Sequence, residues 1–239
     1  MTSPLVDPAP LRGRAREAQN NDGAILRAAR EVFSEYGWGA PMSEIAARAN
    51  TGVASIYRRY PSKGDLVNAI RVFSLEQICA LAEDSATAAR EAGTAEAPAG
   101  AGSAVERFLR RHIESASPPL ASTFGRYVET TPEIDRLAER LRLALEDVVA
   151  VDRARGTIPA HYGPADIMLT ITHLRPTLSA SPERSREIHL RELDYVLHGL
   201  RSVAASGSQI SGTPSDWQEW LRLNSTNAGR SGEGHATGA

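Results

Sequence analysis

The sequence contains a single cysteine, Cys79, and a single lysine, Lys63, among its 239 residues. One cysteine excludes an intrachain disulfide. This favours a protein of a reducing compartment over a secreted protein whose fold is stabilised by disulfides. No apolar run approaches the roughly 18 residues that a membrane-spanning helix needs. The N-terminus, which contains Pro4, Pro8 and Pro10, lacks the apolar segment of a signal peptide. We therefore expect a cytoplasmic protein without a membrane partner.

A strong net charge is also absent, because the formal net charge is −2. Residues 1–65 carry nine basic and seven acidic side chains, and the remainder carries eighteen and twenty-two. This mild asymmetry suits DNA contact at the N-terminal end only if the basic groups gather on one face. GxSxG, glycine-rich phosphate-loop, HExxH and HxxxH motifs are missing. We predict neither an enzyme nor a cofactor or metal site.

Helical periodicity runs through the chain, and no strand-like alternation persists, so we predict an all-α protein. Residues 1–20 are aperiodic and are predicted to be a flexible arm, and residues 206–239 a largely disordered tail. In that tail a capped helical turn presents Trp217 and Trp220, which either dock on the body, as we favour, or bind a partner. The predicted helices begin near 21 and end at 36, and then cover 41–49, 53–60, 62–89, 104–116, 119–128, 132–155, 164–175 and 182–205.

Local signals mark the ends of the first four helices. Gly37 is expected to stop the first helix and Pro41 to begin the second. Asn50 can adopt a left-handed conformation in the turn that follows. Ser62 and Asp65 form a capping box for the long fourth helix. The apolar residues Ile25, Ala29, Val32, Phe33 and Tyr36 are predicted to form the buried face of the first helix.

Helices 41–49 and 53–60 have the spacing of a helix-turn-helix. If Ile56 and Tyr60 point inward, the outward residues are Ala54, Ser55, Tyr57 and Arg58. That face is small and polar and carries one guanidinium, which can bind guanine in a major groove, while Tyr57 can reach a phosphate. Lys63, at the start of the next helix, is predicted to bind a phosphate. Two short helices with a turn also occur in ordinary bundles, so spacing alone leaves that alternative open.

The segment 25–66, ILRAAREVFSEYGWGAPMSEIAARANTGVASIYRRYPSKGDL, resembles the DNA-binding domain of the TetR family of bacterial repressors. Asn50 departs from the usual turn glycine, and Ala40 stands where many members have a threonine that caps the second helix and touches a phosphate. The positions that match the family pattern are Ala28, Ala29, Phe33, Gly37, Ile45, Ala46, Ala49, Ile56, Tyr57, Arg58, Arg59, Tyr60, Ser62, Lys63 and Leu66.

The resemblance implies a three-helix helix-turn-helix DNA-binding domain in residues 21–65. An antiparallel helical bundle for ligand binding and dimerisation would follow in residues 66–205. The expected function is that of a homodimeric repressor that a small-molecule ligand releases from double-stranded operator DNA. The alternative is a DNA-binding regulator or architectural protein without small-molecule induction, although simple compaction of DNA needs no such large helical body.

The last predicted helix carries Leu190, Leu193, Leu197 and Leu200 at alternating spacings of three and four. Such a seam is typical of helix pairs, and the resemblance implies that the last two helices form the dimer interface. Plain core packing would give the same pattern.

The ligand pocket is expected among the larger side chains of the regulatory helices, for each of which core packing is the ordinary alternative. His112 and His173 are expected to satisfy local hydrogen bonds rather than to bind a metal. The candidate pocket residues are Phe108, His112, Phe124, Tyr127, Leu141, Leu145, Met168 and Thr172.

Overall fold

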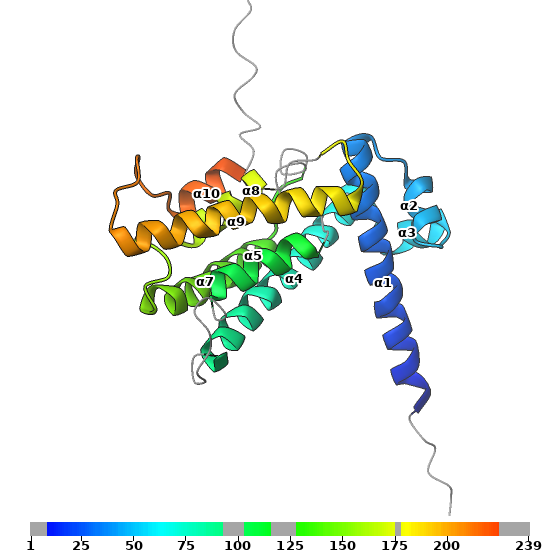
Figure 1. Cartoon of the computed structure of the whole chain (residues 1–239). Coiled ribbons are helices and arrows are strands. Elements are labelled where there is room, and N and C mark those ends of the chain that lie inside the picture. Colours follow the sequence, from blue (N-terminus) through cyan, green and yellow to red (C-terminus); the bar gives the residue numbers. More distant parts are fainter. Residues whose placement is uncertain (1–8, 93–102, 116–127, 175–177, 225–239) are drawn as a thin grey trace, which may run out of the picture. The chain divides into compact units, whose positions relative to one another are not determined.

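The structure is a computed structural model that describes residues 9–92, 103–115, 128–174 and 178–224, with the backbone alone for residues 9–21. The regular elements in these ranges are all helices, which confirms the predicted all-α class (Figure 1). The chain divides into two compact units, Met1–Phe73 and Ser74–Ala239. Among the described helices, none has both the length and the apolar character required to cross a membrane.

The N-terminal unit consists of α1 (Ala9–Tyr36), the 3-10 turn η1 (Gly37–Gly39), α2 (Met42–Arg48), α3 (Val53–Arg59) and the start of α4 (Lys63–Ala92). Burying one large aliphatic or aromatic side chain contributes about 1.5–3 kcal/mol, so a small shared core is enough to hold α2 and α3 on α1. That core is formed by Ile25, Ala29, Val32, Phe33, Ile45, Ile56, Leu66 and Ile70.

α1 begins at Ala9, well before the predicted start near Asn21, so the expected flexible arm is helical from residue 9 onward. The added stretch is rich in Arg, Ala, Glu and Gln, which favour helices, and Pro10 lies in the first turn, where proline is tolerated. The prediction that Tyr36 faces the core is wrong, because its side chain is 54% exposed. Tyr36 is the last residue of α1, where the chain leaves the core.

The predicted local signals are present in the backbone. Gly37 and Asn50 have φ angles of 60° and 49°, in the left-handed region that ends a helix or allows a tight turn. At the start of α4, the Asp65 carboxylate accepts from the Ser62 N–H at 3.0 Å, and the Asp65 N–H donates to the Ser62 hydroxyl at 3.1 Å. The capping box is therefore confirmed. Pro41 lies one residue before its predicted position, as the N-cap of α2.

The C-terminal unit contains the rest of α4 and five further described helices. Its core includes Phe108, Leu141, Leu145 and Ile167, which are buried together. Residues 116–127, which include the predicted helix 119–128 and the candidates Phe124 and Tyr127, lie outside the described residues. The five helices are α5 (Ala104–Glu114), α7 (Pro132–Ala154), α8 (Pro164–Leu174), α9 (Pro182–Ser206) and α10 (Trp217–Asn224).

A buried carboxylate joins α7 to the beginning of α5. Asp152 is fully buried and accepts hydrogen bonds from the Ser103 hydroxyl at 2.6 Å and from the backbone N–H groups of Ala104 and Val105 at 3.0 and 2.9 Å. The first N–H groups of a helix have no partner within the helix, and an anion there is stabilised by the helix dipole. Asp152 therefore satisfies the N-terminus of α5 from a neighbouring helix.

Two predictions about the C-terminal region change. Leu193 and Leu197 are buried in the core of their own chain, so the alternative of core packing is correct for them and the prediction that they form a dimer seam is wrong. Residues 207–224, which were predicted to belong to a largely disordered tail, have a defined structure. They include α10, which packs on α8 (Figure 1). Trp217 and Trp220 are buried, which confirms that they dock on the body. Their rings lie 4.5 Å apart between centroids.

Candidate nucleic-acid interface

α2 and α3 form a helix-turn-helix in which each helix contributes one fully buried isoleucine. Ile45 of α2 and Ile56 of α3 are buried in the N-terminal unit. Asn50 makes the turn in the left-handed conformation, and the extended backbone of Gly52 provides the N-cap of α3. Because the core fixes one face of α3, the opposite face is presented to solvent.

The outward face of α3 carries the side chains that the sequence predicts to bind DNA. Ala54, Tyr57 and Arg58 are exposed and Ser55 is half-buried, with 45% of Tyr57 accessible. The Arg58 guanidinium donates to the Ser55 hydroxyl at 2.8 Å. Among the described residues Arg58 has no carboxylate partner within salt-bridge distance. This guanidinium is therefore available to an acceptor on DNA.

The other two arginines of the helix-turn-helix are paired with carboxylates. Arg48 binds Glu35 of α1 through two nitrogens at 2.5 and 2.6 Å, and it also contacts Glu44 at 3.1 Å. The hydrogen bonds from Arg48 lower the pKa of Glu35, and the same contact raises the pKa of Arg48. Arg59 lies 2.7 Å from Asp22 of α1. These pairs connect α2 and α3 to α1 and leave Arg58 as the unpaired charge on the outward face.

Lys63 lies at the N-terminus of α4, but its ammonium group points at the backbone of the η1 turn. Its Nζ donates to the carbonyl oxygens of Trp38 and Ala40, each at 2.8 Å. It also lies 5.8 Å from the ring centroids of Phe33 and Trp38, within the range of a cation–π contact. Two of its three N–H donors are therefore used inside the protein, and at most one remains for a phosphate.

The predicted ligand residues occupy different environments in the C-terminal unit. Phe108, Leu141 and Leu145 are fully buried, and Met168 is partly buried against the same core. The His112 ring stacks on Phe108 with 6.1 Å between centroids. The exposed Thr172 donates its hydroxyl hydrogen to the Met168 carbonyl at 2.9 Å, and His173 bonds the Leu169 carbonyl at 2.8 Å.

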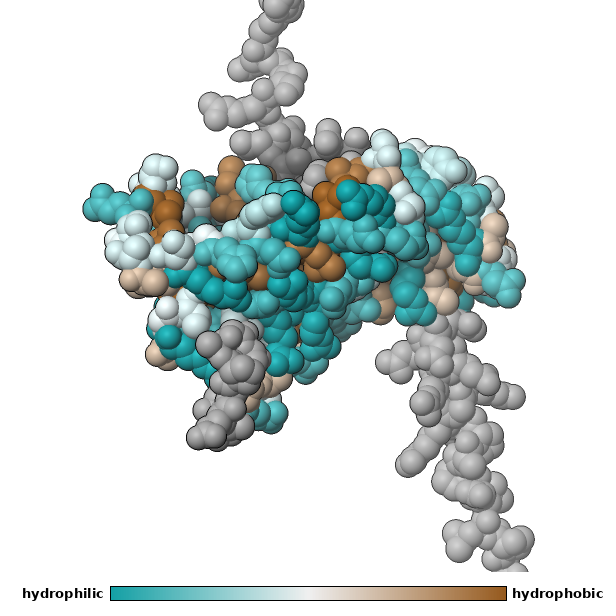
Figure 2. Space-filling view, in the orientation of Figure 1, coloured by the Kyte–Doolittle hydropathy of each residue, from teal (hydrophilic) through white to brown (hydrophobic). Residues whose placement is uncertain are grey.

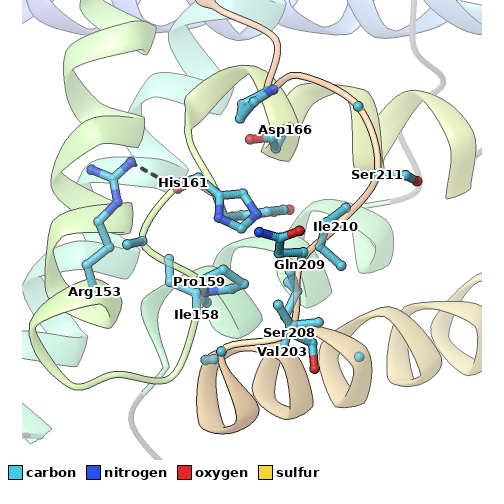
Figure 3. A pocket seen from close by; sticks show the side chains of 18 of the residues that line it. Arg153, Ile158, Pro159, His161, Asp166, Val203, Ser208, Gln209, Ile210 and Ser211 are labelled. Atoms are coloured by element: carbon cyan, nitrogen blue, oxygen red, sulfur yellow. Dashed lines mark hydrogen bonds between the residues drawn. The ribbon is translucent and has the colours of Figure 1, made fainter.

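A groove of about 1210 Å³ lies elsewhere in the C-terminal unit, and none of those candidates lines it (Figure 3). Its walls are the connection 156–162 between α7 and α8, the last part of α9 and the segment 207–214, together with Arg153 of α7 and Asp166 of α8. Sequence reasoning missed it because separate segments of the chain form it. The one signal in the sequence is Gly199, a glycine inside a long helix.

No cluster of three or more potential metal ligands occurs among the residues whose side chains are described. Cys79 is buried, and burial raises its pKa to about 11. A thiol with a raised pKa is a poor nucleophile because little of it is thiolate at neutral pH.

Comparisons with known proteins agree with this arrangement. The sequence profile described as "Bacterial regulatory proteins, tetR family" matches residues 25–70, which include α2, α3 and the turn. A TetR transcription regulatory protein from Mycobacterium vanbaalenii has a similar crystal structure, with 26% identity, a TM-score of 0.53, and coverage of 80% of this chain and 99% of that one. A TetR transcriptional regulator from Streptomyces coelicolor has 25% identity, a TM-score of 0.51, and coverage of 75% and 98%. No match was found among curated proteins.

Proposed function

Because the chain belongs to the TetR family of bacterial DNA-binding transcriptional regulators, we propose that it is a homodimeric repressor that a small-molecule ligand releases from its operator. The observation that carries the proposal is the exposed face of α3, on which Tyr57 and the unpaired Arg58 stand beside small side chains. Since the family is not enzymatic, the function follows from binding.

In the proposed complex the outward face of α3 enters a major groove. Ala54 and Ser55 allow close approach, and Tyr57 donates its hydroxyl to a phosphate. Arg58 exchanges its bond to Ser55 for the O6 and N7 acceptors of a guanine, which a guanidinium binds through two hydrogen bonds. Lys63 acts mainly by holding the η1 turn, because its donors already bind two carbonyls.

The neighbouring arginines of α3 provide a matched test of the DNA-binding face. Arg58→Ala should lower affinity for the DNA upstream of the gene that encodes this chain. It should also reduce the base preference at one base pair of each half-site by about 1–3 kcal/mol. Arg59→Ala removes the same charge from a side chain that is paired with Asp22, and it should leave base preference unchanged. Fluorescence anisotropy with single-base variants of the duplex measures both. Equal base preference in wild type and Arg58→Ala would contradict the proposed role.

We place the dimer interface on the outward face of α9, since Leu193 and Leu197 are used in the core. Tyr195 is 59% exposed there and stacks with Arg191, whose guanidinium carbon lies 5.7 Å from the ring centroid. Tyr195→Glu should give folded monomers by analytical ultracentrifugation and weaken operator binding, because two linked half-sites bind more tightly than one. Tyr36→Glu, at a similarly exposed tyrosine of the other unit, is the control and should stay dimeric. A dimeric Tyr195→Glu would place the interface elsewhere.

Release by a ligand requires that the ligand prefer the form that does not bind DNA. α4 is one continuous helix from Lys63 to Ala92, so a shift at its distal end can reach the helix-turn-helix. Typical couplings of about 1–3 kcal/mol give roughly 5–150-fold weaker operator binding, and DNA must weaken ligand binding by the same factor. Calorimetry of a binding compound with and without operator duplex tests this. Equal affinity in both conditions would favour a regulator without small-molecule induction.

A further inference from the structure

The groove lined by 156–162, the last part of α9 and 207–214, here called the α9 groove, has apolar walls that are open to solvent. Val196, Leu200 and Val203 of α9 line it. Ile210 lines it too and is 56% exposed, and Figure 2 shows hydrophobic surface near the C-terminal end of α9. Ligand sites for small molecules are typically concave, mostly apolar, and supplied with a few polar groups. The α9 groove has this composition.

Gly199 widens the groove at the expense of helix stability. A glycine inside a helix costs about 1 kcal/mol relative to alanine. A Cβ atom built at Gly199 would meet no atom within 4 Å, so no close contact within the chain requires a glycine there. Gly199 lines the groove, and its missing side chain leaves space that a larger residue would fill.

The acidic group of the groove, Asp166, forms no salt bridge among the described residues, although His161 and Arg153 lie near enough for their charge to act on it. Asp166, in the first turn of α8, accepts one hydrogen bond through Oδ2 from the Gly163 N–H at 2.8 Å. Burial raises the pKa of Asp166, against the opposing effects of that bond, His161 and Arg153. An ammonium group placed beside a partly buried carboxylate relieves this cost of burial.

The basic group of the groove is already neutralised. The Arg153 guanidinium donates to the Glu146 carboxylate at 2.8 Å and to the Tyr162 carbonyl at 3.0 Å, the bond that is dashed in Figure 3. These contacts hold the guanidinium against α7 and the connection that follows it. An anionic ligand would have to compete with Glu146 for it.

The helix ends at the groove favour a cation as well. α7 ends at Ala154 and α9 at Ser206, and both run directly into segments that line the groove. The carbonyl end of a helix attracts positive charge, and α9 has no basic residue in its last turn. The N-terminus of α8 would attract an anion, but the Asp166 carboxylate already lies there and accepts the Gly163 N–H.

We propose that the α9 groove is the effector site and that it binds small amphiphilic amines. The apolar body of the ligand lies against Val196, Leu200 and Val203, and its ammonium group faces Asp166. Figure 3 shows the side chains of His161 and Gln209 extending toward one another across the groove, where they can donate or accept further hydrogen bonds. That the groove acts as an effector site rests on the proposed release of DNA by a ligand. That it binds an amine does not depend on that proposal.

Three probes with the same ten-carbon chain test the class of ligand: decylamine, decanol and decanoate, each below its micelle concentration. Calorimetry with the full-length chain in the absence of DNA should give about tenfold tighter binding of decylamine than of the other two. Asp166→Asn keeps the acceptor for the Gly163 N–H and should abolish the preference for the amine. Asp135→Asn removes the same charge from the first turn of α7, at the opposite end of that helix, and should leave the preference intact.

Two glycine variants test the location. Gly199→Leu should fill the groove and weaken decylamine binding more than tenfold, while Gly199→Ala should bind decylamine and raise the melting temperature. Equal binding of the three probes, unchanged binding to Gly199→Leu, or a preference for the amine that survives Asp166→Asn would each overturn the proposal. Loss of dimerisation in Gly199→Leu would overturn it too and make the groove a subunit interface. Decylamine that binds as expected but leaves operator affinity unchanged would uphold the site and refute only ligand release.

Discussion

Replacement of Lys63 by methionine distinguishes a structural role of this residue from direct phosphate binding. Methionine has a similar length but no charge, so it removes both hydrogen bonds to the Trp38 and Ala40 carbonyls and the cation–π contacts with Phe33 and Trp38. A hydrogen bond from a charged donor contributes about 1.5–3 kcal/mol when buried. Since Lys63 is only part-buried, we take a total of about 2–3 kcal/mol for the pair, after discounting for solvent screening.

The loss should appear as local opening of the η1 turn and α2. Hydrogen exchange followed by mass spectrometry should show amides of α2 exchanging about 30-fold faster or more in Lys63→Met, because 2 kcal/mol of opening free energy corresponds to that factor. Arg58→Ala serves as the control and should leave exchange in α2 unchanged, since the hydrogen bond of Arg58 within the described part of the chain goes to Ser55 of its own helix.

DNA binding separates the two roles further. A lost phosphate contact lowers the slope of log K against log salt by about 0.9, whereas a loosened α2 weakens binding with less than about half that change. We therefore expect Lys63→Met to bind operator and random duplex more weakly with a nearly unchanged slope. A slope lower by about one unit, together with unchanged exchange in α2, would refute this reasoning and restore direct phosphate binding.

Three further predictions concern stability. Asp152→Ala should lower the free energy of unfolding by about 3–5 kcal/mol in urea titrations, because it leaves buried donors of α5 without an acceptor, and a loss below about 1 kcal/mol would contradict that role. The lowered pKa of Glu35 means that its stabilising contact is present above the ordinary value of 4.5 and is lost as the pH falls through the folded-state value. Thermal melts should therefore lose less stability on acidification in Glu35→Gln than in wild type; identical profiles would argue against the contact. Leu197→Glu should unfold or aggregate by circular dichroism and sedimentation, and a folded monomer would instead restore the dimer seam.

The helix-turn-helix could be predicted from the sequence because its signals are local. Gly37 and Asn50 are residue types that adopt the left-handed backbone conformation, and Ser62 and Asp65 form hydrogen bonds with each other across one helical turn. The outward residues follow once Ile56 is assigned to the core. The hydrogen bonds of the Lys63 ammonium group could not be predicted. Its acceptors are backbone carbonyls 25 and 23 residues earlier in the chain, and such contacts have no signature in the sequence.

The C-terminal unit was harder to predict because the same residue spacing serves two purposes. The leucines of α9 repeat at threes and fours both for a core and for a helix–helix interface, and only the burial of Leu193 and Leu197 distinguishes them. The α9 groove depends on how the connection 156–162 and the segment 207–214 meet α9, which no local pattern encodes. Asp152 likewise stabilises a helix that begins 48 residues before it.

The central claim is that two copies of this chain bind DNA through α3. Selection from a random duplex library, with wild type and Arg58→Ala in parallel, tests it most directly. We predict that wild type enriches a near-palindrome whose half-sites lie about one helical turn, or a multiple of it, apart. Arg58→Ala should lose the preference at one symmetric pair of positions and keep the rest. An asymmetric single site, no enriched site, or the same enriched site for both proteins would contradict the account.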